Sequence, residues 1–365
     1  MMTLPASAET NSASPENRRL DALVGALIGT AVGDGLGLPM EGLSARRQQK
    51  LFPLPLRHRL IGRLGMISDD TEHTLMIGLS LLESPDDPSA FQRCFARKLR
   101  WWLASLPAGV GFATLRAILK LLLGIPPSRS GVMSAGNGPA MRSALLGVYF
   151  VDDAERRREF VRSSTQVTHR DLRAEIAALA VAETAAWMTK QGSDVEGLVQ
   201  SLADLSDVSE WTTIMEKLRA ALSRDGTTAS FARELGATCG VSGYAFQSAP
   251  AAIYAALRHR DSFATALSEA IACGGDTDTV GAITGALVGA RVGEAGIPAS
   301  WRDGFVDWPR SVALLRRVGT KLNRQLDAQC PLGQVRCFWP AIPIRNLAFL
   351  VVVLAHGFRR LLPPY

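Results

Sequence analysis

Two acidic clusters, more than two hundred positions apart in a chain of 365 residues, carry the side chains best suited to chemistry. The first spans residues 68–74, with the sequence Ser-Asp-Asp-Thr-Glu-His-Thr, and the second spans residues 274–279, with the sequence Gly-Gly-Asp-Thr-Asp-Thr. Each cluster sets carboxylates beside hydroxyl groups. Such all-oxygen donors are the ligands that hard divalent cations prefer. The clusters therefore predict a site for Mg²⁺, Mn²⁺ or Ca²⁺.

Both clusters also have the pattern of a helix N-terminus. Ser68 or Asp69 would serve as the N-cap residue, and Asp70 and Glu72 would complement the dipole of the first turn. Taken alone, each cluster fits this structural role as well as it fits a metal site. Two helix starts do not need so many acids, however, and adjacent carboxylates repel each other unless a cation or several donors compensate. We therefore expect the two helix starts to face each other across a shared metal centre.

Two Gly-rich segments carry weaker signals. The string at 33–37 is followed by Glu41, which is either an exposed loop carboxylate or a general acid or base near the metal. Residues 136–142 form a turn of small residues before a helix, and its free N–H groups suit either a phosphate or an ordinary helix start. Neither segment has the context that a nucleotide-binding fingerprint requires.

Two further segments add a histidine and two aromatic rings. Residues 168–171 predict another helix start, with Thr168 as its cap and His169 beside it. A lone histidine is more often structural than catalytic. Residues 243–246 place Tyr244 and Phe246 in a loop, suited either to stacking on a base or to closing the core.

The elements that must position these residues are helices. Apolar residues recur at helical spacing along almost the whole chain and strand-like alternation is scarce, so the predicted fold class is all-α. The runs at 25–33 and 281–289 are rich in Gly and Ala, which would allow two helix backbones to approach closely. Neither run reaches the roughly eighteen uninterrupted apolar residues that a membrane-spanning helix needs. We predict a buried helix pair at the centre of a bundle.

Composition limits the function classes. The chain is 47 % hydrophobic, which is enough for a sizeable core, and its net charge of +6 is spread along most of its length. This distribution is not the footprint of a nucleic-acid-binding protein, and no nucleic-acid partner is expected. Five cysteines, with no CxxC pair, indicate neither disulfides nor a zinc site, and they favour a cytoplasmic location.

We predict three segments along the chain. Residues 1–19 are expected to be a disordered lead-in, residues 20–310 a helical domain, and residues 311–365 a C-terminal helical extension. Turn-rich stretches near 34–68, 124–138, 224–247 and 296–310 interrupt the helices. The end of the extension is apolar and flanked by Arg. We predict a docked C-terminal helix there, with contact to a membrane surface as the alternative.

Taken in order, these motifs resemble the ADP-ribosylglycohydrolase family. The resemblance rests on five segments and covers about residues 20–308: 29–37 with Glu41, 68–71, 136–142, 168–171 and 274–279. Each motif is weak by itself, but five in series are specific. In one departure, Ser68 stands where Thr is commoner before the Asp pair, and the hydroxyl remains. The role of His73 is left open.

The resemblance implies a compact all-α, orthogonal multi-helix bundle and a site with two divalent cations, Mg²⁺ or Mn²⁺. The implied metal ligands are Ser68, Asp69, Asp70, Asp276, Asp278 and Thr279. The implied catalytic carboxylates are Glu41, Asp70 and Asp278. The implied substrate-binding residues are Asn137 and Gly138 near the diphosphate, His169 near the ribose, and Tyr244 and Phe246 near the adenosine.

The implied activity is metal-dependent hydrolysis of an ADP-ribosyl bond by an activated water. The substrate would be an ADP-ribosylated protein, with arginine as the predicted target, or a small ADP-ribosyl compound. The alternative is a catalytically silent ADP-ribose-binding or structural protein of the same fold. All six implied metal ligands are present, which favours the enzyme. The enzyme hypothesis needs the two acidic clusters to lie together in space.

Overall fold

Two glycine-rich helices, α1 (Pro15–Gly37) and α15 (Thr277–Val292), pack backbone against backbone in antiparallel directions. A Cβ atom added at Gly29 would lie 2.1 Å from the carbonyl oxygen of Gly285, and one added at Gly285 would lie 2.1 Å from that of Gly29. For Gly25 and Gly289 the corresponding distances from an added Cβ atom to the other residue's carbonyl oxygen are 2.1 Å and 2.2 Å. Side chains larger than hydrogen do not fit here. The close helix pair predicted from the two small-residue runs is thus present.

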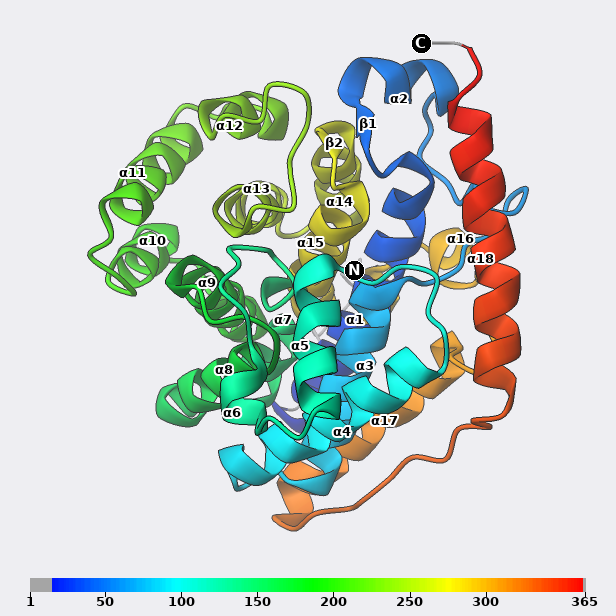
Figure 1. Ribbon diagram of the computed structural model, residues 1–365. Coiled ribbons are helices and arrows are strands. Elements are labelled where there is room, and N and C mark those ends of the chain that lie inside the picture. Colours follow the sequence, from blue (N-terminus) through cyan, green and yellow to red (C-terminus); the bar gives the residue numbers. More distant parts are fainter. Residues whose placement is uncertain (1–14, 364–365) are drawn as a thin grey trace, which may run out of the picture.

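The computed structural model describes residues 15–363, and helices make up most of it (Figure 1). The first half contains η1 (Leu38–Met40), β1 (Leu43–Ser44), α2 (Ala45–Leu51), α3 (Asp69–Glu83), α4 (Pro88–Ala104), α5 (Phe112–Leu122), α6 (Pro127–Ser130), η2 (Ala140–Arg142), α7 (Ala144–Tyr149), α8 (Ala154–Thr168) and α9 (Leu172–Thr189). The second half contains α10 (Val195–Ala203), α11 (Ser209–Ser223), α12 (Thr228–Glu234), α13 (Ala245–Arg258), α14 (Phe263–Ala272), β2 (Gly274–Gly275), η3 (Glu294–Gly296), α16 (Ala299–Arg302), α17 (Val312–Ala328) and α18 (Ala341–Arg360). The predicted all-α fold class is confirmed.

The central pair is enclosed by other helices. α9, α13 and α14 pack against α15, and α3 and α17 pack against α1. In Figure 1, α10 to α12 lie on one side of the pair and α18 runs along the opposite edge. α17 contributes Leu314, Leu315, Val318 and Leu322 to the main core. The predicted extension therefore begins with a helix that is part of the central packing.

Two predictions about the first forty residues need correction. The predicted lead-in included residues 15–19, which are helical in α1, while residues 1–14 lie outside the described residues. The Gly-rich string at 33–37 was expected to begin a turn-rich stretch, but it forms the last turns of α1. Its glycines are needed for packing, because a Cβ atom at Gly33 would lie 2.0 Å from the carbonyl oxygen of Gly281. The turn-rich stretch also contains α2.

Replacement of Gly29 by Ala should destabilise the fold. Over-packing of a well-packed core typically destabilises a protein by about 1–3 kcal/mol. The added methyl group would meet backbone atoms, which cannot move aside as a flexible side chain can, so we expect a destabilisation at or above the upper end of this range. We expect Gly29→Ala to lower the midpoint of urea unfolding, measured by circular dichroism. Gly357→Ala in α18 is the matched control, because its Cβ would meet no atom within 4 Å. Equal midpoints for the two variants would contradict the proposed packing.

Candidate active site

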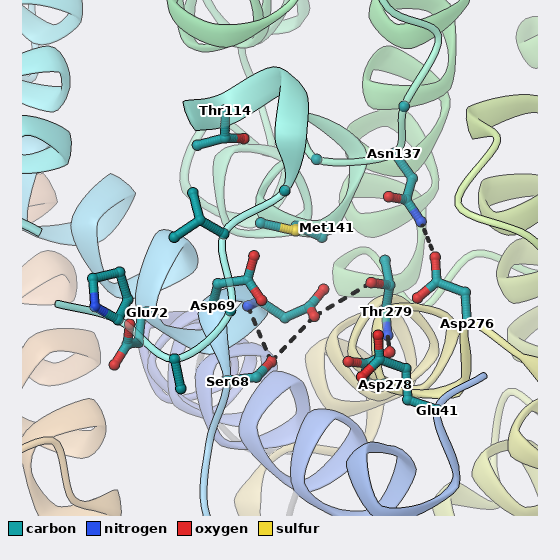
Figure 2. A pocket seen from close by; sticks show the side chains of 18 of the residues that line it. Glu41, Ser68, Asp69, Glu72, Thr114, Asn137, Met141, Asp276, Asp278 and Thr279 are labelled. Atoms are coloured by element: carbon teal, nitrogen blue, oxygen red, sulfur yellow. Dashed lines mark hydrogen bonds between the residues drawn. The ribbon is translucent and has the colours of Figure 1, made fainter. Parts of the chain in front are cut away.

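The two acidic clusters meet at facing helix N-termini. Ser68 caps α3, which begins with Asp69 and Asp70, and α15 begins directly after Asp276. The Thr279 hydroxyl donates a hydrogen bond to Oδ2 of Asp70 at 3.3 Å, which joins the two clusters directly (Figure 2). Segments separated by more than two hundred positions thus share one site, as the sequence predicted.

Helix capping explains only part of these acids. The Ser68 hydroxyl accepts a hydrogen bond from the Asp70 backbone N–H at 3.4 Å, so the helix-start interpretation of this segment is also correct. The Asp276 side chain makes no capping hydrogen bond to α15. It accepts instead from Nδ2 of Asn137 at 2.7 Å, as the dashed line between the two residues in Figure 2 shows. Its carboxylate is therefore held toward the cavity rather than toward its own helix.

Asp34, near the end of α1, attaches the α3 cluster to the central pair. Its Oδ2 atom accepts from the Ser68 N–H at 2.8 Å, from the Thr71 N–H at 3.2 Å and from the Thr71 hydroxyl at 2.5 Å. The sequence analysis assigned no role to this residue. The sequence feature that could have identified Asp34 is its position as an acid within an otherwise apolar helical run, because a buried carboxylate needs specific partners. Asp34 is fully buried.

Positive-φ glycines place the α15 cluster beside Glu41. β1 and β2 pair antiparallel, with Leu43 opposite Gly275, so the chain that leaves Glu41 runs along the chain that enters α15. Gly275 has a φ of +82°, and a Cβ atom there would lie 2.0 Å from the carbonyl oxygen of Val241. Only glycine tolerates both the backbone conformation and the close approach.

Ten of the predicted site residues line one cavity of about 480 Å³. They are Glu41, Ser68, Asp69, Asp70, Asn137, Gly138, His169, Asp276, Asp278 and Thr279. The cavity is bounded by the acidic clusters on one side and by the start of α5 and the 134–141 segment on the other. Catalytic and metal-binding predictions from distant motifs therefore fall on a single cavity.

Tyr244 and Phe246 do not line this cavity. The Tyr244 hydroxyl donates to Glu210 at 2.7 Å, and the Phe246 ring is buried against Trp211 with 5.0 Å between ring centroids. The sequence could not distinguish these positions from a ligand-facing loop, because the direction of the rings depends on α11. Phe112, at the start of α5, is an aromatic residue that does line the cavity.

Burial raises the pKa values of several carboxyl groups at the site, namely Asp34, Asp69, Asp70 and Asp278, and repulsion between the acids adds to the effect at the last three. Burial raises the pKa of Asp69 to about 8, with further repulsion from Asp34, Glu72 and Glu41. Burial also raises the pKa of Asp34 to about 7, although its hydrogen bonds oppose the effect. The pKa values of Asp70 and Asp278 lie well above the ordinary range, through burial and the neighbouring acids.

Glu41 lies at the rim of the cavity, where part of its side chain is exposed. Loss of hydration raises the pKa of its carboxyl, Asp276 adds repulsion, and Arg360 opposes the rise. The Arg360 guanidinium donates to the carbonyl oxygens of Glu41 at 2.6 Å and Pro39 at 3.0 Å. An arginine of the C-terminal extension thus holds the segment that carries Glu41.

α18 supplies another part of the cavity wall that the sequence analysis did not foresee. Arg345, Phe349 and Val353 line the cavity. Nε of Arg345 donates to Asp307 at 2.6 Å, and its Nη1 donates to Glu72 at 3.3 Å. The predicted docked helix is therefore present, and it reaches the site. Its contribution follows from tertiary packing alone, since no local motif marks these residues.

His169 is buried behind the 136–138 turn. A Cβ atom at either Gly136 or Gly138 would lie 3.1 Å from its ring, so the glycines let this turn run directly over the imidazole. Burial and the nearby Arg142 lower the pKa of His169 to about 3, and the ring is neutral at physiological pH. Thr168 does not cap α9 as predicted, because it ends α8 and Asp171 accepts the capping hydrogen bond from Arg173.

His73, whose role was left open, is a buried packing residue. Its ring lies edge-on to Trp102 with centroids 4.8 Å apart, and burial holds its pKa well below the usual value. It does not line the cavity. We therefore assign it to the interface between α3 and α4.

The donor set suits hard cations. Oδ1 of Asp70 and Oδ1 of Asp34 are buried without a hydrogen-bond partner, and oxygen atoms dominate the polar lining near them. Between residues 15 and 363, no three His, Cys, Asp or Glu side chains form a closed metal-binding group. The four aspartates of the predicted ligand set therefore do not form a closed group by themselves, and the hydroxyls of Ser68 and Thr279 are the other oxygen donors beside them. A buried carboxylate oxygen without a hydrogen-bond partner, such as Oδ1 of Asp70, is an atom that a cation would complement.

Comparison with known proteins identifies the family. The chain matches the ADP-ribosylglycohydrolase family over residues 15–330, and it belongs to that family. It is 32 % identical to an uncharacterized protein of Archaeoglobus fulgidus over 77 % of this chain and 90 % of that protein. It is 26 % identical to the ADP-ribosyl-[dinitrogen reductase] glycohydrolase of Rhodospirillum rubrum over 86 % of this chain and 97 % of that protein.

A solved structure titled "ADP-ribosylglycohydrolase-related protein complex" has the same fold. Its TM-score is 0.61 at 28 % identity, and the match covers 84 % of this chain and 99 % of that one. The family match ends at residue 330, whereas α18 begins at Ala341. The wall that α18 adds to the cavity therefore lies outside the family match.

The raised pKa values predict a pH-dependent stability in the presence of EDTA. The buried histidines, whose pKa values are lowered, are neutral in the folded chain, and above about pH 7.5 they are largely neutral in the unfolded chain as well. Asp34 and Asp69 then bind more protons in the folded chain, because their pKa values of about 7 and about 8 exceed the 3.8 that is ordinary for an aspartate. Stability should fall as the pH rises from about 7.5 to about 9.

Urea midpoints at these two pH values measure the effect. Asp69→Asn removes one of the titrating carboxyl groups, so its midpoint should depend less on pH than that of the wild type. A wild-type midpoint that stays constant or increases over this range would show that the acids are not buried together.

Proposed function

We propose that the chain is a divalent-cation-dependent hydrolase that releases ADP-ribose from a modified side chain, with arginine as the target. The observation that carries the proposal is the convergence of the two acidic clusters, joined by the hydrogen bond from Thr279 to Asp70, on the floor of one cavity. Membership of the ADP-ribosylglycohydrolase family supports the class of reaction. The relative from Rhodospirillum rubrum, which acts on ADP-ribosyl dinitrogen reductase by its name, supports a modified protein as substrate.

The proposed cation site is formed from both helix starts. Ser68, Asp69 and Asp70 would hold one side of a pair of Mg²⁺ or Mn²⁺ ions, and Asp276, Asp278 and Thr279 the other. When bound, such ions supply positive charge that orients ribose hydroxyls and lowers the pKa of a water. The same charge would stabilise the ionised form of carboxylates whose pKa values are otherwise raised by burial and repulsion.

The proposed binding of the substrate follows the cavity lining. Asn137 and Gly138 line the cavity at a turn of small residues, which we propose lies against the diphosphate. The Asn137 backbone N–H donates to the Gly243 carbonyl oxygen at 3.0 Å, so it is not among the groups that would bind the diphosphate. The neutral His169 imidazole lies behind this turn and suits a ribose hydroxyl better than a phosphate. Tyr244 and Phe246 were predicted to contact the adenosine, but their rings face away from this cavity. We propose Phe112 for stacking on the adenine.

Proton transfer in the proposed reaction needs a carboxylate near the water. Glu41, Asp70 and Asp278 line the cavity, and any of them can accept the proton of the water once its carboxyl group is ionised. Cleavage at the anomeric carbon develops positive charge on the ribose, and the surrounding acids would stabilise that charge. We favour direct attack by water, without a covalent intermediate.

Release of ADP-ribose from defined substrates tests the proposal. We expect the wild type to release ADP-ribose from ADP-ribosylated arginine with Mg²⁺ or Mn²⁺, and not with EDTA. Asp69→Ala and Asp278→Ala should each lower kcat/KM on the order of 100-fold or more, because removal of even an indirect metal partner costs about 10- to 100-fold. ADP-ribosylated serine and nucleic acids in parallel reactions identify the preferred linkage.

Asp261→Ala is the control, because this carboxylate is exposed and paired with Arg291 away from the cavity. Circular dichroism separates loss of chemistry from loss of fold. Wild-type rates in either cavity variant, or full activity in EDTA, would contradict the metal site. Binding of ADP-ribose without release from any substrate would support the catalytically silent alternative.

A further inference from the structure

An apolar stripe runs along the outer face of α18. The α18 stripe consists of Ile344, Leu347, Val351, Leu354, Phe358 and Leu361, and each side chain is more than half exposed. The spacings alternate between three and four residues, so the six side chains share one straight face of the helix. Large exposed apolar patches mark contact with a partner or a membrane.

The opposite face of α18 is fixed to the protein. Nδ2 of Asn346 donates to the Ser105 carbonyl oxygen at 2.7 Å, and Nε2 of His356 donates to that of Leu60 at 2.7 Å. Arg345 is buried with Asp307 and Glu72, and Phe349 is buried in a small cluster with Leu60. The helix is long and apolar enough to cross a bilayer. Its polar contacts hold it instead against the rest of the protein. Figure 1 shows it running along the edge of the molecule.

A basic, acid-free segment lies against the C-terminal end of α18. Residues 42–68 contain six Lys and Arg and no Asp or Glu, and residues 328–365 contain four Arg and no Asp or Glu. Together they hold ten of the 40 Lys and Arg residues and none of the 34 acids, so the rest of the chain is net negative. The His356 contact to Leu60 and a hydrogen bond from Arg47 to the Arg360 carbonyl oxygen join the two segments.

The basic segment adds apolar side chains to the same end of the helix. Ile61 and Leu64, which pair with each other next to Leu60, are exposed there, and Leu54, Arg57 and Arg63 are exposed in the same segment. At the other end of α18 four exposed aromatic rings gather in two pairs: Trp101 with Trp339, and Trp308 with Phe338. Apolar contact area, flanking Arg and aromatic rings occur together at membrane–water interfaces.

We propose that the α18 stripe, together with residues 53–64 of the basic segment, binds the surface of an anionic lipid bilayer, with α18 lying parallel to that surface. The stripe would enter the boundary between headgroups and acyl chains, and the Arg side chains would contact anionic headgroups. A second copy of the chain is a less suitable partner, because the two segments that form this face contain Lys and Arg but no acid, so the same face of another copy would offer them no opposite charge. The proposal does not depend on the reaction performed in the cavity.

Co-sedimentation of the full chain with vesicles tests this proposal. We expect it to sediment with vesicles of phosphatidylcholine mixed with phosphatidylglycerol, to stay in solution with pure phosphatidylcholine, and to be released by high salt. The triple variant Val351→Gln, Leu354→Gln, Phe358→Gln should lose binding by about tenfold or more, because the stripe supplies the apolar contact. The double variant Arg57→Gln, Arg63→Gln should weaken the part of the vesicle binding that high salt abolishes.

The triple variant Leu119→Gln, Leu122→Gln, Leu123→Gln is the matched control. It removes three exposed apolar side chains of α5 and its C-cap, away from α18, and should bind vesicles as the wild type does. Circular dichroism and ADP-ribose release of the α18 variant should match the wild type, since none of its three positions lines the cavity. Failure of the wild type to sediment, or equal loss in both triple variants, would overturn the proposal. So would a dimer in sedimentation velocity that only the α18 variant dissociates.

Discussion

Direct contact between the backbones of α1 and α15 sets the position of everything in the site. The glycines at every fourth position leave no side chain between the two helices, so their axial register is fixed by backbone shape. At one end of the contact the Thr277 hydroxyl donates to the Gly37 carbonyl oxygen at 2.8 Å, which aligns the last turn of α1 with the first turn of α15. The chain then leaves α1 toward Glu41 and enters α15 through Asp276. One packing constraint thereby brings acids from two distant segments together.

Charge is the second constraint, and it opposes the first. The packing collects the buried Asp34, Asp70 and Asp278 with the half-buried Asp69, and desolvation and mutual repulsion raise their pKa values. Asp34 is partly compensated by three donors from the start of α3. The remaining acids have few donors and an orphaned oxygen at Asp70. These acids lower the stability of the folded protein when no cation is bound. Such a loss of stability is typical of functional sites.

Local patterns in the sequence were sufficient for much of this structure. Helical periodicity predicted the all-α fold, and the small-residue runs predicted the central pair. The acidic clusters were found because they contain more carboxylates than two helix starts need, and Asn137 was assigned from the family resemblance. Tyr244 and Phe246 were placed near the substrate, but the packing of α11 turns both rings away from the cavity. Arg345 and Arg360 were not found, because only the docking of α18 brings them to the site. The glycines at 33–37 could be assigned to a turn or to a close helix contact, and only the position of α15 decides between the two.

The central claim is that the two helix starts hold divalent cations jointly. Anomalous X-ray scattering from crystals grown with Mn²⁺ would locate such ions directly, independently of any activity. The account predicts manganese peaks between the Asp69–Asp70 side and the Asp276–Asp278 side, within bonding distance of both. Manganese bound to only one cluster, or found elsewhere while this cavity stays without it, would contradict the account.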